Sequence, residues 1–387
     1  RECTLPRLSI RRSRQTVLYT VFCLVFLVGG APASFAHDDD DRRLLIFGDS
    51  LSDTGNAWAL GAGISFRPFE LIPSAPYFTL RFTNGRTWVE RLAKKAGTPR
   101  TAKAVFLFPR KGRNYAIGGA RARSVDGSSL LPDLPGQVEQ FLLAHDSMLT
   151  PSDLVVMAVG GNDVRDAIVE FGDVIASGDS EDEALLASAR ILCQAVASIE
   201  ENIGDLLERA GAQNLLVVNA PNLGVTPALT ILGSETSMLG TELSMLFNLL
   251  LEQGDGASSP VQGICEQYAV SIQGLSSPEP LPRDHGVQIA LFDVFGLLTD
   301  VTYAPEDFHL SNGTDACITP GVRFGAICWN PGPWKYVFWD GIHPTAAMHR
   351  IVAREAIDFA IAADLLPADS FAEADDGGFD AGSHDDE

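Results

Sequence analysis

Short apolar runs alternate with longer segments of helical periodicity along most of the chain. Apolar runs of four to six residues are typical of strands buried inside a parallel sheet. A weaker strand candidate spans residues 114–117. Because amphipathic helical segments lie between the runs, the pattern predicts a parallel sheet flanked by helices. The four stronger strand candidates are residues 44–47, 154–159, 215–218 and 289–292.

Two helices are marked clearly by the sequence. Apolar residues recur at spacings of four and three from Leu185 to Leu206, which predicts the buried face of one long helix, and Gly211 is suited to end it. We interpret this helix as a core element rather than a partner-binding surface. A last helix is expected to begin near Pro344, since proline is favoured in the first turn, and to end near Ala362.

Two segments, residues 58–80 and 254–286, interrupt this pattern. Both contain many glycines and prolines, and the first is also rich in aromatic residues. They are longer than ordinary connections in a compact domain, which predicts functional loops or lids.

Composition and charge restrict the class of protein. Of the 387 residues, 46% are hydrophobic and 20% are charged, which is typical of a folded domain rather than a disordered chain. The formal net charge is −22. Binding to a nucleic acid or an anionic membrane needs clustered Lys and Arg side chains, so we expect neither as a partner.

The N-terminal segment, residues 1–36, has the features of a signal peptide. It carries several arginines and then an apolar run at 17–28 that is shorter than a membrane span. Ser34 and Ala36 then offer small side chains on either side of Phe35, as a cleavage site requires. We therefore expect a secreted or periplasmic protein with no transmembrane anchor after cleavage. An uncleaved anchor is the alternative.

Composition also sets the boundaries of the other segments. Residues 37–42 are mostly acidic and are predicted to form a flexible linker. Residues 43–366 contain the strand and helix patterns and are predicted to form one domain, which we expect to act as a monomer. Residues 367–387 are acidic and contain no basic residue, which predicts a disordered tail.

Three segments with candidate chemistry follow predicted strands. The Gly-Asp-Ser-Leu sequence at 48–51 places Ser50 directly after the first strand, where open α/β sheets bind their ligands. The glycine pair at 118–119 lets backbone N–H groups approach a ligand closely. Asn162 offers an amide donor just after the strand at 154–159. Each segment alone also fits an ordinary turn or helix cap.

Asp340 and His343 lie three residues apart, just before the predicted last helix. In one loop the carboxylate can accept a hydrogen bond from one imidazole nitrogen and leave the other facing a nucleophile. A capped helix start is the simpler interpretation of this pair alone. Metal ligation is disfavoured because no further His or Cys lies nearby at ligand spacing, and we expect neither a metal nor a cofactor.

Together the four segments resemble the motif blocks of the GDSL, or SGNH, hydrolases, which are named for Ser, Gly, Asn and His. The resemblance spans roughly residues 43–362. The extended motifs at 47–56, 82–86 and 338–345 look most like those of secreted bacterial lipases and phospholipases. The matching residues, in the family's order, are Ser50, Gly119 with Gly118 as its competitor, Asn162 and His343.

The resemblance implies a flavodoxin-like α/β/α sandwich with a five-stranded parallel sheet. It implies that Ser50 is the nucleophile, that His343 is its base and that Asp340 orients the imidazole. The backbone N–H groups of Ser50 and Gly119 and the side chain of Asn162 would form the oxyanion hole. The implied activity is hydrolysis of carboxylic esters, with lipid or lysophospholipid acyl esters favoured.

Other activities fit the same residues. An acyl-enzyme can pass its acyl group to an alcohol instead of water, so a lipid acyltransferase and a carbohydrate acetyl-esterase are alternatives. An inactive binding or adhesion module is an alternative from a different class. The intact serine, asparagine, aspartate and histidine argue against that module.

Four cysteines follow the predicted signal peptide, and in an exported chain they fit two disulfides with three possible pairings. Cys317 and Cys328 bracket a short segment with proline and glycine and pair most naturally. Cys193 and Cys265 would then form the second pair. Four reduced, buried thiols are the alternative.

Overall fold

The computed structural model describes most of the predicted domain. The predicted signal peptide, nearly all of the predicted linker and nearly all of the acidic tail lie outside the described residues, as do large parts of the segments 58–80 and 254–286. The described residues are 42–61, 77–125, 131–144, 147–254, 263–267, 269–275, 286–318, 328 and 330–368.

The main sheet contains four parallel strands in the order β1-β2-β3-β4. Each strand lies within one or two residues of a predicted apolar run, so all four stronger strand predictions are confirmed. The carboxyl ends of the strands meet at one edge of the sheet, where the chemical motifs follow. The strands are β1 (Leu44–Gly48), β2 (Leu154–Ala158), β3 (Asn214–Val218) and β4 (Gln288–Phe292).

The weaker strand candidate at 114–117 pairs with β1 without forming a regular strand. The N–H of Tyr115 donates to the carbonyl of Ile46 at 2.7 Å, and this segment meets β1 through an isolated parallel bridge between Asn114 and Ile46. The N–H of Ile117 also donates to the carbonyl of Gly48 at 3.0 Å, so the pairing reaches the last residue of β1. Among the described residues the sheet has four regular strands rather than five, and the edge segment at 114–117 completes the flavodoxin-like order.

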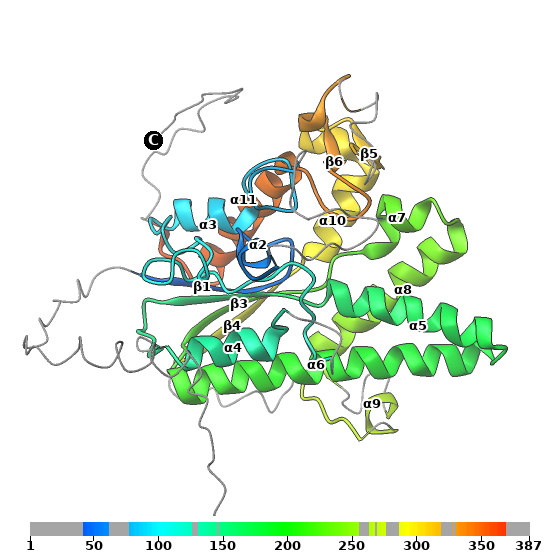
Figure 1. Ribbon diagram of the computed structural model, residues 1–387, viewed down its shortest axis with the longest axis horizontal. Coiled ribbons are helices and arrows are strands. Elements are labelled where there is room, and N and C mark those ends of the chain that lie inside the picture. The colour runs from blue at the N-terminus through cyan, green and yellow to red at the C-terminus, as the bar shows by residue number, and fades with distance from the viewer. Residues whose placement is uncertain are drawn as a thin grey trace, which may run out of the picture. The chain divides into compact units, whose positions relative to one another are not determined.

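Helices cover both faces of the sheet (Figure 1). Side chains of each strand alternate between the two faces, as strand geometry requires, so Leu45 and Phe47 join one core cluster while Leu44 and Ile46 join the other. We call the first the α6 face and the second the α11 face. The α6 face is covered by α4 (Leu134–Leu142), α5 (Gly161–Ser177), α6 (Glu181–Ala210) and α8 (Ser234–Gln253), and the α11 face by α3 (Trp88–Lys95), α10 (Val294–Tyr303) and α11 (Ala346–Ala362).

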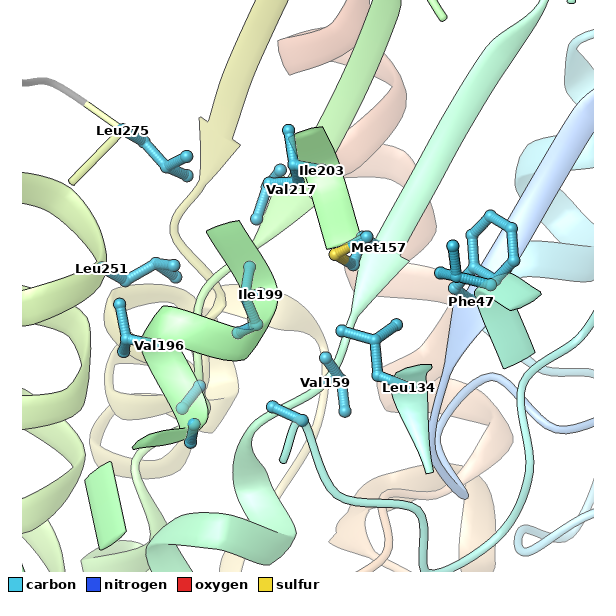
Figure 2. Close-up of a cluster of buried hydrophobic side chains, with 14 of the residues drawn as sticks. Phe47, Leu134, Met157, Val159, Val196, Ile199, Ile203, Val217, Leu251 and Leu275 are labelled. Carbon is cyan, nitrogen blue, oxygen red and sulfur yellow. The ribbon is translucent and has the colours of Figure 1, made fainter. Parts of the chain in front are cut away.

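The predicted long helix is α6, and its ends have clear local causes. Ser180 and Glu183 form a capping box, in which each side chain binds the backbone N–H of the other residue. Gly211 adopts the left-handed conformation after the helix, with φ of 71°. Apolar side chains of α6 pack against Met157 and Val217 of the strands (Figure 2). Leu185 is 40% exposed and lies off the buried stripe, which begins at Ala184.

The last helix begins later than predicted. Thr345 is its N-cap, because the Thr345 hydroxyl accepts the Met348 N–H at 3.2 Å. Pro344 therefore precedes the helix instead of occupying its first turn. The predicted end at Ala362 is confirmed.

A second sheet of two parallel strands was not predicted from the sequence. Its first strand is largely polar, so it lacks the apolar run that marks the main strands. Within the described chain, no helix is both long and apolar enough to cross a membrane. The remaining elements are α2 (Asn56–Gly61), η1 (Leu223–Val225), α7 (Pro227–Thr230), α9 (Ile264–Gln267), η2 (Pro305–Phe308), β5 (Asn312–Ala316), η3 (Pro333–Lys335) and β6 (Tyr336–Phe338).

The four cysteines pair as predicted. A disulfide between Cys193 and Cys265 joins α6 to α9, with a Cα–Cα distance of 5.5 Å. A second disulfide joins Cys317 to Cys328, with a Cα–Cα distance of 4.7 Å.

Candidate active site

The end of β1 holds Ser50 at the carboxyl edge of the sheet. The Gln137 side-chain amide makes two hydrogen bonds with the backbone of Gly48, one to its N–H at 3.0 Å and one to its carbonyl at 2.9 Å. A Cβ at Gly48 would overlap the carbonyl oxygen of Ala158, so only glycine fits this close approach of β1 to β2. The chain then turns and presents Ser50, which is partly exposed.

Asp53 organises two of the sequence motifs at once. Its carboxylate accepts the N–H groups of Gly55, Asn56 and Ala57, all within 2.9 Å, and so caps α2. It also accepts the N–H of Gly118 at 2.8 Å. Burial raises the pKa of Asp53 above its ordinary value, while these four hydrogen bonds oppose that effect.

The hydrogen bond to Asp53 distinguishes the two candidate glycines. The Gly118 N–H is occupied, whereas the Gly119 N–H has no hydrogen-bond partner among the described residues. Gly119 is exposed and has φ of +83°, a conformation that favours glycine. Of this pair, Gly119 is therefore the residue whose N–H is available to a ligand.

Ser50, His343 and Asp340 form a continuous hydrogen-bonded chain. Ser50 Oγ lies 2.9 Å from His343 Nε2, and His343 Nδ1 lies 2.7 Å from Asp340 Oδ2. The other carboxylate oxygen, Oδ1, accepts the N–H groups of Ile342 at 2.8 Å and His343 at 2.7 Å. Burial opposes ionisation of Asp340, but the charge of His343 and these hydrogen bonds outweigh it and hold the pKa of Asp340 below its ordinary value.

Two aromatic residues contact the Asp340–His343 pair, and the sequence analysis assigned neither of them a role. The Tyr77 hydroxyl donates to Asp340 Oδ2 at 2.7 Å. The Phe82 ring packs on the His343 ring with 5.4 Å between centroids. Phe82 belongs to the 82–86 motif noted above, so a signal existed for it, whereas Tyr77 was part of a segment interpreted only as a loop.

The rest of the 82–86 motif holds the start of α11, next to His343. The Thr83 hydroxyl donates to the carbonyl of Pro344 at 2.8 Å. Asn84 Oδ1 accepts the N–H of Ala346 at 2.7 Å and so satisfies a free donor at the helix N-terminus. A segment from early in the chain thereby fixes the histidine loop from outside.

The third motif connects α5 to the glycine motif. Asn162 Nδ2 donates to the Ala120 carbonyl at 2.9 Å, and Asp163 Oδ2 accepts the Ala122 N–H at 2.7 Å. Burial raises the pKa of Asp163 to about 7. Asn162 lines the same cleft as Ser50 and His343, so the structure brings the predicted serine, asparagine and histidine together. In the described part of the chain, no group of three or more His, Cys, Asp or Glu side chains is arranged to hold a metal ion.

A parallel α/β sheet with a Ser–His–Asp chain at its carboxyl edge is typical of hydrolases that use a serine nucleophile. The sequence profile of the GDSL-like lipase/acylhydrolase family matches residues 44–356. The chain belongs to this family and is a carboxylic ester hydrolase.

Three relatives illustrate the range of the family. A GDSL esterase/lipase of Arabidopsis thaliana is 26% identical over 338 residues, which cover 80% of this chain and 86% of the relative. The thermolabile hemolysin of Vibrio parahaemolyticus is 25% identical over 83% of this chain and 64% of its own. A phosphatidylcholine-sterol acyltransferase of Aeromonas hydrophila is 25% identical over 82% of this chain and 89% of its own.

Proposed function

We propose that this protein hydrolyses carboxylic esters through an acyl-enzyme on Ser50. The observation that carries the proposal is the 2.9 Å and 2.7 Å hydrogen-bond chain from Ser50 through His343 to Asp340. His343 takes the proton of Ser50 as the Oγ attacks the ester carbonyl, and then gives that proton to the leaving alcohol. Asp340 holds the imidazole orientation and stabilises its cation. Water then releases the acyl group by the reverse sequence.

The oxyanion hole would consist of the backbone N–H groups of Ser50 and Gly119 and the amide of Asn162. Neither of the two backbone N–H groups has a hydrogen-bond partner among the described residues. Because such donors act on the charge that develops during attack, loss of one typically lowers kcat by about 10²–10³-fold.

The proposed substrates are lipid or lysophospholipid acyl esters. Support comes from the mostly aliphatic lining of the cleft at Ser50. A second candidate function, acyl transfer to an alcohol, is favoured by the name of the Aeromonas hydrophila relative. Both reactions share the acyl-enzyme and differ only in the acceptor.

We also propose that the protein is exported. The N-terminal sequence pattern and the two disulfides support export, since disulfides persist mainly in oxidising compartments.

The proposed nucleophile is tested with Ser50→Ala and His343→Ala. Both variants should lose ester hydrolysis by about 10³-fold or more, measured on p-nitrophenyl butyrate, and a fluorophosphonate probe should label the wild type but not Ser50→Ala. Ser177→Ala, on an exposed part of α5, is the matched control. A folded Ser50→Ala protein with full activity would refute the proposal. Product analysis with and without an added alcohol separates hydrolysis from transfer.

A further inference from the structure

A cleft lined mainly by apolar side chains opens beside Ser50 and His343, and we call it the outer cleft. It has a volume of about 230 Å³. Its walls come from α5, from the α7 region and from the histidine loop, and they include the aliphatic side chains of Ile168, Leu229 and Leu232. Because such walls favour apolar ligand surface, an ester whose carbonyl lies at Ser50 would place an apolar group along them.

A smaller space lies against the α11 face, and we call it the inner pocket. It has a volume of about 60 Å³, and its walls include the buried residues Trp88, Met348 and Val352. Ring nitrogens of two residues that line it already form hydrogen bonds within the protein. Trp88 Nε1 donates to Ser52 Oγ at 3.1 Å, and His349 Nδ1 accepts the Trp88 N–H at 3.3 Å. Burial lowers the pKa of His349 to about 3, so this imidazole is neutral at ordinary pH.

The outer cleft and the inner pocket share part of their walls. Leu51, Pro221 and Ile342 line both spaces, so a thin layer of side chains separates them. Ile342 is 37% exposed and is therefore not locked into the core. Asp49 also lines both, and burial raises its pKa to about 6, so its carboxylate is neutralised more readily than an exposed one.

We propose that one acyl chain of the substrate occupies the outer cleft and that its far end enters the inner pocket past Leu51 and Ile342. This inference rests on the proposed reaction at Ser50, which sets the position of the carbonyl. Taken together, the outer cleft and the inner pocket only approach the lower end of the volume range of small-molecule sites, which is roughly 300–1,000 Å³. They fit a single unbranched chain, so the substrate class is a mono-acyl ester, and the inner pocket sets the accepted chain length.

The test changes the size of Val352, which lines the inner pocket but not the outer cleft. Val352→Phe fills the pocket, and Val352→Ala enlarges it. The measurement is kcat/KM on p-nitrophenyl acetate, butyrate, octanoate, dodecanoate and palmitate. The ratio of long-chain to acetyl kcat/KM should fall at least about tenfold in Val352→Phe and should rise in Val352→Ala for the longest chains.

The matched control is Ile175→Phe, on an exposed position of α5 that lines neither space, and its ratio should equal that of the wild type. If Val352→Phe does not fold, the inference is tested by Val352→Ala alone, whose ratio of long-chain to acetyl kcat/KM should rise. The inference would be overturned if the ratio of long-chain to acetyl kcat/KM were the same in the wild type and both Val352 variants. A wild type active on the acetate ester alone would also overturn it. A wild type inactive on every ester would instead refute the proposed function.

A second observation, independent of the cleft, concerns Tyr77. Its hydroxyl binds Asp340 Oδ2, the same oxygen that contacts His343 Nδ1. Its ring packs edge-on against Trp339, with centroids 6.3 Å apart. Burial and the charge of Asp340 raise the pKa of Tyr77 above its ordinary value, so the hydroxyl stays protonated and remains a donor.

We infer that Tyr77 is a positioning residue that acts on His343 through Asp340. Backbone N–H groups restrain the Oδ1 atom of Asp340, and Tyr77 restrains the Oδ2 atom that contacts the imidazole. A restrained Oδ2 keeps the imidazole aligned with Ser50 during proton transfer. This alignment affects the chemical step and has no part in holding the ester.

Tyr77→Phe keeps the ring and removes only the hydroxyl. We expect kcat to fall roughly tenfold to a hundredfold, as for loss of one hydrogen bond to a charged group, with KM changed by less than about twofold. Tyr303→Phe, at a position 77% exposed, is the matched control and should leave both constants unchanged. An unchanged kcat in Tyr77→Phe, or a raised KM with kcat intact, would overturn the inference.

Discussion

The two faces of the sheet are built from similar apolar residues, but each contains a different imperfection, meaning a departure from close apolar packing. At the α6 face, the carboxylate of Asp163 is fully buried, and its Oδ1 atom has no hydrogen-bond partner among the residues that the structure describes. Arg123 Nη1 lies 3.5 Å from that oxygen. At the α11 face, the imperfection is the inner pocket of about 60 Å³.

Each imperfection lies next to the candidate active site, and each has a different use. Asp163 holds the backbone of Ala122, close to the glycine motif, and a buried hydrogen bond of this kind rigidifies its surroundings. The inner pocket instead leaves space beside Leu51. Interiors are normally packed with few voids, so rigid packing and free space lie on opposite faces of one sheet.

The largest expected effect tests how tightly the α6 face is packed. Phe141 contacts the rings of Phe47 and Tyr115, at centroid distances of 5.9 Å and 5.8 Å. Phe141→Ala should lower the free energy of unfolding by about 3–5 kcal/mol, because a well-packed site cannot collapse around the cavity. Urea unfolding monitored by circular dichroism measures this loss. A loss below about 1 kcal/mol would mean that the α6 face has as much free space as the other.

A smaller effect is expected from the ionisation of the buried Asp163 carboxylate, which lowers the free energy of unfolding. The pKa of Asp163 is raised to about 7 in the folded protein, so the folded state binds more protons than the unfolded state between roughly pH 4 and 7. The free energy of unfolding therefore falls as pH rises through that window and loses no more above it. Asp163→Asn removes this contribution and keeps an acceptor for Ala122.

Unfolding in urea at pH 5 and pH 8 provides the measurement. The stability of Asp163→Asn relative to the wild type should rise by about 2 kcal/mol between these two values. Because the comparison is between the two proteins, the other buried carboxylates cancel. A relative stability that stays flat or falls with pH would show that Asp163 is ionised in the folded protein throughout.

The smallest effect comes from adding the same methylene to each face. Val196→Ile overfills the α6 face and should cost about 1 kcal/mol or more. Val352→Ile extends into the inner pocket and should be neutral or stabilising by up to about 0.8 kcal/mol. Both residues are buried valines on helices, so each controls for the other. Equal destabilisation by the two changes would remove the distinction between the faces.

Much of the fold was predictable because its signals are local. The strands of the main sheet are short apolar runs, and the long helix α6 has a periodic stripe, a capping box and a terminal glycine. The second sheet was missed because Asn312–Ala316 has no apolar run and pairs only through its position in the fold. The start of the last helix was predicted two residues too early, because a proline near a helix start can stand in the first turn or just before the N-cap.

The motifs alone indicated which residue types could carry the chemistry: a serine after a strand, an asparagine after another, and an aspartate three residues before a histidine. Those motifs depend on neighbours in the chain. Three contacts appear only in the folded chain: Ser50 lies 2.9 Å from His343, Asp53 accepts the N–H of Gly118, and Tyr77 donates to Asp340. Such contacts join segments far apart in sequence, and their geometry depends on how every intervening element packs.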